Sequence, residues 1–255
     1  MKKIDFVVAG KRYEYDVPDK WEEVSSDQFR AYVEAGSFGP DMVRRLMSMD
    51  DVVAVSLTPA DWWCVCQEFQ WMQDTDGIGK LYIDQITLPD GTVCYGYNSD
   101  FSDVTWEEWM FADTYASRGQ WHVVAAVLYR PQRKDWNHET DRRIPFSKFG
   151  ASDRMEQTAK IDPLTMRCIQ VNYLLLRKRM TDHFYHIFIE AVDEEEDNSN
   201  GSRKGKQKGA TDWLSIIRNM MGDNFYEEQK YYQLSVPSVL FQLESRVKEA
   251  KKHGK

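Results

Sequence analysis

The residues that could do chemistry in this 255-residue chain are its cysteines, its histidines and several paired carboxylates. Cys64 and Cys66 are separated by a single residue, whereas zinc knuckles and redox pairs use a two-residue gap. The apolar neighbours Trp62, Trp63 and Phe69 predict instead that both cysteines lie on a buried helix.

Two histidines have a spacing that could share a metal ion. His183 and His186 are three residues apart on a predicted helix, with Asp182 beside them. The sequence marks no third ligand, and the adjacent Phe184 and Phe188 are typical of a packed helix face. We therefore expect no metal at this position, or elsewhere in the chain.

Paired carboxylates occur at Glu22–Glu23 and Glu107–Glu108. Both pairs lie at predicted helix starts, where acidic side chains favour the positive end of the helix dipole. The sequence contains no glycine-rich phosphate loop and no nucleophile elbow. It therefore predicts no catalytic residue, no cofactor and no enzyme; a polar cluster lining a pocket would favour the alternative, an enzyme without a recognisable motif.

The charge balance argues against nucleic acid as a partner. The formal net charge is -8 and the isoelectric point is about 5.2, whereas phosphate-binding surfaces are rich in Lys and Arg. The basic run Arg203–Lys208 follows the acidic run Asp193–Asp197, which is typical of a solvated linker. A better basic patch, Arg130–Lys134 with Arg142–Arg143, has no stacking aromatic residue besides Trp136.

Cysteine content and hydropathy predict a soluble protein of a reducing cytoplasm. Four cysteines are too few and too irregularly placed for a secreted disulfide scaffold, and no signal peptide opens the chain. The most apolar stretch, Val123–Tyr129, is far shorter than the roughly 18 residues that a membrane span needs.

The periodicity of apolar residues predicts mainly helices. Alternating residues predict β-hairpins at Ile4–Val17 and Leu81–Tyr97. The predicted helices cover Trp21–Ala35, Pro40–Met49, Pro59–Gln73, Thr105–Ser117, Trp121–Tyr129 and 163–190.

An internal repeat emerges when the chain is offset by 80 residues. Trp21–Phe29 then aligns with Phe101–Trp109, matching aromatic, acidic, Val and hydroxyl residues in turn. Both segments carry a capping box, at Ser25–Gln28 and at Thr105–Glu108. Chance similarity between amphipathic helices is the alternative explanation.

The predicted fold class is mainly α (α+β). Residues 1–192 form a helical body of two divergent repeats, at about 1–75 and 80–160, each a helical hairpin with a small β-hairpin, followed by the long helix 163–190. Residues 193–209 form a flexible charged linker, and residues 210–255 form a C-terminal helical module that is too small to be stable alone.

Three segments carry a resemblance to a known group of proteins: Glu23–Phe29, Ala125–Pro131 and the predicted helix Trp213–Met221. They resemble tailed-bacteriophage morphogenesis proteins, and most nearly the tail assembly chaperones. The resemblance implies a non-enzymatic adaptor in the host cytoplasm that binds tape-measure or tail-tube subunits and prevents their aggregation. The chain is longer than is usual for that group and carries two hairpins, so a structural virion subunit, such as a connector or minor tail component, is the alternative.

Aromatic residues are the candidate partner-binding residues, because Trp and Tyr are enriched at the centres of protein interfaces. We expect helix faces or a strand edge to hold hydrophobic segments of another protein, with oligomerisation also open. The predicted contact residues are Trp21, Phe29, Trp106, Trp109 and Trp213.

Overall fold

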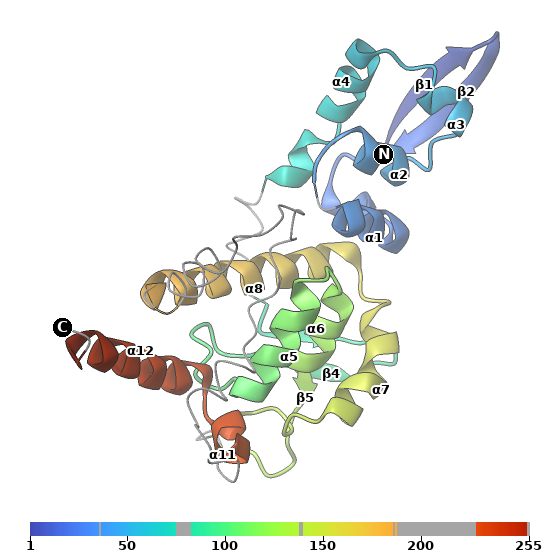
Figure 1. Cartoon of the computed structure of the whole chain (residues 1–255). Helices are drawn as coiled ribbons and strands as arrows, with labels where there is room; N and C mark the ends of the chain where they lie inside the picture. Colours follow the sequence, from blue (N-terminus) through green and yellow to red (C-terminus); the bar gives the residue numbers. More distant parts are fainter. Residues whose placement is uncertain (36, 75–82, 138–139, 186, 188–227, 254–255) are drawn as a thin grey trace. The chain divides into compact units, whose positions relative to one another are not determined.

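The computed structural model describes residues 1–35, 37–74, 83–137, 140–185, 187 and 228–253. The chain forms two compact units (Figure 1). Unit 1 consists of Met1–Ile83 and Ala159–Val171, and unit 2 consists of Asp84–Thr158 and Asn172–Lys255. Unit 1 is therefore built from two stretches of sequence that are separated by a stretch of unit 2.

Unit 1 begins with an antiparallel hairpin of β1 (Lys2–Val8) and β2 (Lys11–Val17). The strands are joined at Ala9 and Gly10, whose φ angles are 49° and 77°. Positive φ at both central residues gives a tight turn that matches the twist of the strands, and glycine adopts it at little cost. Alternate residues face inward, and Val17 is buried. These strands lie where the sequence predicts them.

Short helices complete unit 1. They are η1 (Trp21–Glu23), α1 (Ser26–Ala35), α2 (Pro40–Leu46), α3 (Asp51–Ala54), α4 (Pro59–Gln67), η2 (Gln70–Gln73) and the first part of α8 (Pro163–His183). Before α1, the Ser25 hydroxyl accepts a hydrogen bond from the Gln28 amide, and the Gln28 side chain accepts one from the Ser25 amide. Thr58 and Asp61 form the same reciprocal pair at the start of α4. Both pairs satisfy amides that would otherwise lack a partner at a helix start.

Unit 2 combines a three-stranded antiparallel sheet with helices. Its strands, in the order β3–β4–β5, are β3 (Gln85–Thr87), β4 (Val93–Tyr95) and β5 (Arg130–Pro131). Its helices are α5 (Trp106–Ala116), α6 (Trp121–Leu128), α7 (Lys148–Thr158), the rest of α8, α11 (Glu228–Gln233) and α12 (Val236–His253). The central helix is α6, which packs against α5 and α7 and buries every residue from Val123 to Leu128.

The second predicted capping box is only half formed. The Thr105 hydroxyl accepts a hydrogen bond from the Glu108 amide, as predicted. The Glu108 carboxylate, however, lies 2.8 Å from Arg130 Nη2 and is buried. The prediction of a reciprocal box at α5 was therefore wrong, because a buried cation competes successfully for this carboxylate.

The described part of the C-terminal segment docks within unit 2. The Trp106 amide donates to the Leu234 carbonyl, and the Val236 amide donates to the Val104 carbonyl. The inward face of α12 buries Val239 and Leu240. Residues 188–227, which include the predicted linker 193–209, lie outside the described residues.

The described residues confirm the coarse prediction of a mainly helical fold with small antiparallel sheets. Within the described ranges, no helix has the length and apolar character that crossing a bilayer would require.

Candidate binding site

The predicted contact residues lie in the cores of the two units. Trp21 and Phe29 of unit 1 are 6% and 8% exposed, and Trp106 and Trp109 of unit 2 are both 0% exposed. Burial of this extent favours a packing role, because these side chains can reach a partner only if the unit opens. Their role as contact residues therefore stays a prediction. Trp213 lies outside the described residues.

Trp21 is the centre of an aromatic cluster in unit 1. Its ring packs edge-on against Tyr32 and Trp71, with centroid distances of 5.6 Å and 5.3 Å, and against Phe29 at 6.3 Å. Edge-to-face packing is the favoured geometry for aromatic pairs. The cluster joins η1, α1 and η2, so aromatic residues far apart in the sequence pack together here, with Trp21 and Phe29 buried and Tyr32 and Trp71 partly exposed.

The guanidinium of Arg167, from the first part of α8, lies over two rings of this aromatic cluster. Its Cζ atom is 5.2 Å from the Trp21 centroid and 5.1 Å from the Tyr32 centroid. Arg167 Nη1 donates to Gln170 Oε1 at 2.7 Å, and Nη2 makes a long contact of 3.4 Å with the Met72 carbonyl. The residue is 6% exposed. Cation–π contacts are strongest when both groups are desolvated, and here Arg167 and Trp21 are both buried, whereas Tyr32 is partly exposed.

Arg167 has no counter-ion in the part of the chain that the structure describes, and its Nε has no hydrogen-bond partner there. Burial lowers the pKa of its guanidinium, which only Tyr32 and Cys168 oppose. A buried charge is normally paired, because removing it from water is costly. Arg167 is thus a buried cation that carboxylates could stabilise further.

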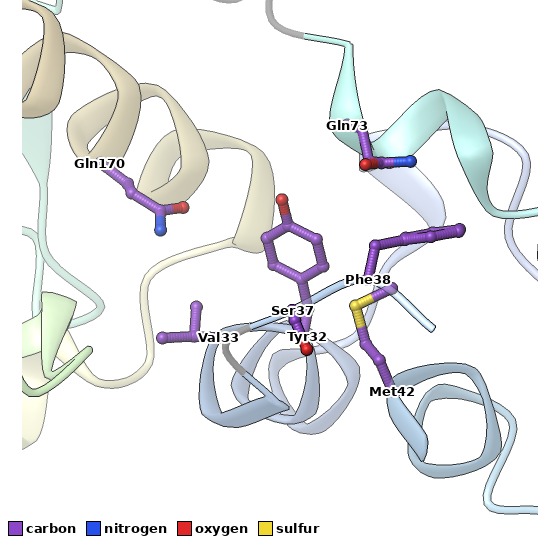
Figure 2. Close-up of a pocket in the computed structure, with 7 residues that line it drawn as sticks. All are labelled: Tyr32, Val33, Ser37, Phe38, Met42, Gln73 and Gln170. Carbon is purple, nitrogen blue, oxygen red and sulfur yellow. The ribbon is translucent and has the colours of Figure 1, made fainter. Parts of the chain in front are cut away.

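A cavity of about 190 Å³ lies beside this arginine in unit 1. Its walls come from α1, the segment that follows it, α2, η2 and α8, and Figure 2 shows the side chains of Tyr32, Val33, Ser37, Phe38, Met42, Gln73 and Gln170. None of these lining residues is charged. Gln170 connects the cavity to Arg167, because its Oε1 accepts the hydrogen bond from Arg167 Nη1.

Unit 2 contains a buried ionic cluster that sequence reasoning missed. Arg130 and Arg143 are 0% and 1% exposed, so they do not belong to the basic surface patch that was predicted. Arg130 Nη2 lies 2.8 Å from Glu108 Oε1, and Arg143 makes a bidentate pair with Asp141 at 2.9 Å and 3.0 Å. Arg143 also lies 3.4 Å from Asp103 Oδ2. Burial raises the pKa of Glu108, with the two arginines opposing this shift.

The ionic cluster has a structural explanation. Arg143 Nη1 donates to the Leu128 carbonyl, Arg130 Nη1 donates to the Val127 carbonyl, and both acceptors belong to the last turn of α6. Helix C-terminal carbonyls lack intrahelical donors and favour cations. The cluster therefore fastens the end of α6 to the chain around Asp141.

The cysteine and histidine predictions have different outcomes. Cys64 is exposed and Cys66 partly exposed, so the prediction of a fully buried pair was wrong. Cys94 is buried, and burial raises its pKa to about 11. His183 packs its ring edge-on against Phe184 at 4.6 Å, and His186 lies outside the described residues. Among the described residues, no group of three His, Cys, Asp or Glu lies close enough together to hold a metal ion.

Exposed apolar side chains occur on three elements of unit 1. Trp63 of α4 is 65% exposed, Val52 of α3 is 48%, Val55 just after α3 is 83%, and Val7 of β1 is 69%. The sequence predicted a buried helix here, because Trp62, Trp63 and Phe69 are apolar. The structure corrects this prediction.

No protein-family model, curated protein sequence or solved structure matches the chain. The resemblance to phage morphogenesis proteins therefore continues to rest on the sequence segments that suggested it.

Proposed function

We propose that this chain is a non-enzymatic assembly adaptor of the phage tail assembly chaperone type, which binds hydrophobic segments of tape-measure or tail-tube subunits. The observation that carries the proposal is the 65% exposure of Trp63 on α4. Tryptophan is the residue type most enriched among the energetic centres of protein interfaces, and a large exposed ring is costly to keep in water. An exposed ring of this kind supports a role in binding another protein.

Other exposed apolar side chains of unit 1 support the same role. Val52 and Val55 expose their side chains on and just after α3, and α3 packs against β1, which exposes Val7. The Lys2–Glu68 ion pair links the start of β1 to the residue after α4. An apolar segment of a client could contact side chains of this kind, as helices do in grooves and strands do along sheet edges.

The proposal includes the internal repeat. In each unit, a β-hairpin precedes two helices that pack on each other, namely α1 with α2 and α5 with α6. The first helices begin at Ser26 and Trp106, which is the predicted offset of 80 residues. This shared order supports a duplication. In this proposal the first copy kept an exposed binding surface, and the second copy acquired the buried ionic cluster of unit 2.

The test is co-expression of the chain with the tail genes encoded beside it, followed by affinity purification and mass spectrometry. We expect the tape-measure or tube subunit to co-elute with the parent chain, and Trp63→Ala to reduce its recovery at least about tenfold, as loss of an interface centre does. Phe149→Ala is the matched control, because Phe149 is 86% exposed on α7 of unit 2.

Purified phage particles separate this proposal from the structural alternative. A chaperone is absent from finished particles, whereas a connector or minor tail subunit is present at fixed stoichiometry. Detection of the chain in particles would overturn the chaperone proposal, as would equal recovery of the client by the parent chain and Trp63→Ala.

A further inference from the structure

The cavity beside Arg167 has the chemistry of a ligand site. Ser37, Gln73 and Gln170 contribute polar groups to its wall, and Val33, Phe38 and Met42 contribute apolar ones. Its volume of about 190 Å³ is smaller than the roughly 300–1,000 Å³ of most small-molecule sites. It therefore suits one amino-acid side chain or a small organic molecule.

The Gln170 carboxamide has a fixed orientation. Its Oε1 accepts the 2.7 Å hydrogen bond from Arg167 Nη1, so its Nε2 amino group is the end that remains for a ligand. Among the described residues, Nε2 has no partner, and neither does the Gln73 carboxamide or the Ser37 hydroxyl. A carboxamide whose oxygen is polarised by a cation is a stronger donor at its nitrogen. Ser37 and Gln73 are exposed and can also bond to water, whereas Gln170 is 8% exposed, so its amino group is the buried donor of this wall that lacks a partner among the described residues.

The positive charge of Arg167, behind this wall of the cavity, determines which ligand charge is favoured. Arg167 is 6% exposed and, within the described ranges, pairs with no carboxylate. A cationic ligand would be repelled, and a neutral ligand would leave the guanidinium uncompensated. A carboxylate can accept about four hydrogen bonds and supplies the missing opposite charge.

We propose that this cavity of unit 1 is a carboxylate site, in which Gln170 Nε2, Gln73 and Ser37 bind the two oxygens and Arg167 compensates their charge through Gln170. The apolar wall of Val33, Phe38 and Met42 fits the methylene groups of a glutamate side chain or of a small organic acid. The site is independent of the adaptor function proposed above.

Gln170 offers two informative substitutions. Gln170→Leu keeps most of the volume and removes the donor, and Gln170→Glu places a carboxylate where the ligand would compensate Arg167. We expect both variants to lose binding. Gln170→Glu should also raise Tm by about 2–4 °C, because it forms a buried charge-assisted pair. Gln242→Glu on α12 is the control, because it makes the same charge change at an exposed position.

The experiment is a titration of the ¹⁵N-labelled full chain, followed through glutamine side-chain NH₂ signals; the signal missing in Gln170→Leu identifies Gln170. The probes are N-acetyl-glutamate amide, its neutral counterpart N-acetyl-glutamine amide, and sodium acetate. We expect saturable shifts of the Gln170 signal with the glutamate probe, at an affinity about tenfold or more above that of the glutamine probe.

The probes also identify the source of the carboxylate. Tighter binding of the glutamate probe than of acetate supports an acidic side chain of a protein, and equal binding supports a free organic acid; both support a carboxylate site. Equal shifts with the glutamate and glutamine probes would overturn the proposal. So would shifts that never saturate, or unchanged binding of the glutamate probe to Gln170→Glu.

Discussion

Replacement of Arg143 by alanine should destabilise unit 2 far more than replacement of its neighbour Arg142. The Arg143 side chain makes four hydrogen bonds, two to Asp141 and one each to the carbonyls of Leu128 and Asp103. It is 1% exposed, so the groups left behind by truncation remain largely out of water.

The expected cost follows from these contacts. Removing one partner of a buried ion pair typically costs about 3–5 kcal/mol, because the remaining charge is uncompensated. Two carbonyl oxygens also lose their donor, although water entering the space that Arg143 vacates can replace part of this loss. We therefore expect Arg143→Ala to lower the free energy of unfolding by about 3–5 kcal/mol.

Arg142→Ala makes the same charge change one residue away. Arg142 stacks on Tyr95 at 3.4 Å and lies 4.8 Å from the Trp136 centroid, and its Nε donates to Gln132 Oε1. Partly exposed cation–π contacts contribute about 0.5–1 kcal/mol each, so this variant should lose only about 1–2 kcal/mol.

Urea unfolding followed by tryptophan fluorescence measures both values, and hydrogen exchange of α6 assigns the loss to unit 2. Equal destabilisation by Arg143→Ala and Arg142→Ala would refute the view that the ionic cluster fastens the end of α6.

Three other measurements follow from single residues. A thiol reagent at pH 8 should modify Cys64, which is exposed, well before Cys94, which is buried and whose pKa is raised to about 11; mass spectrometry of labelled peptides gives the order. Gly10→Ala should cost about 1 kcal/mol in urea titrations, because φ is +77° there, whereas Gly39→Ala, at an extended backbone with open space, should cost less. Burial raises the pKa of Asp103, so its contribution to stability is complete below about pH 4 and is lost as the pH rises through the folded-state pKa; Asp103→Asn should flatten this loss in urea titrations at several pH values.

Local signals in the sequence were sufficient for the hairpin β1–β2 and for the start of α4. Gly10 indicates the turn, and Thr58 followed by Pro59 indicates a capped helix start, because each effect operates within a few residues. The division of the aromatic residues was predicted less well. Trp109 and Trp63 occur in similar apolar helical segments, yet one is 0% and the other 65% exposed. Which ring is covered depends on the elements that pack above it.

The roles of the charged groups also depend on residues that are far apart in the sequence, so they could not be predicted from local signals. Glu108 has the spacing of a capping residue, but Arg130, 22 positions later in the chain, takes its carboxylate. Arg167 and Gln170 were not among the predicted site residues, because their significance comes from Trp21, Tyr32 and Met72, which are far away in sequence. Only the folded unit shows that this arginine has no acidic neighbour among the described residues.

The division of unit 1 into two stretches of sequence has a consequence for biosynthesis. Residues 1–83 leave the ribosome first, but Arg167, which covers Trp21 and Tyr32, follows only 84 residues after Ile83. At about 5–20 residues per second, this delay lasts roughly 4–17 s. During translation, the N-terminal segment must therefore wait with its aromatic residues incompletely covered, and it is a substrate for nascent-chain chaperones and proteases over that interval.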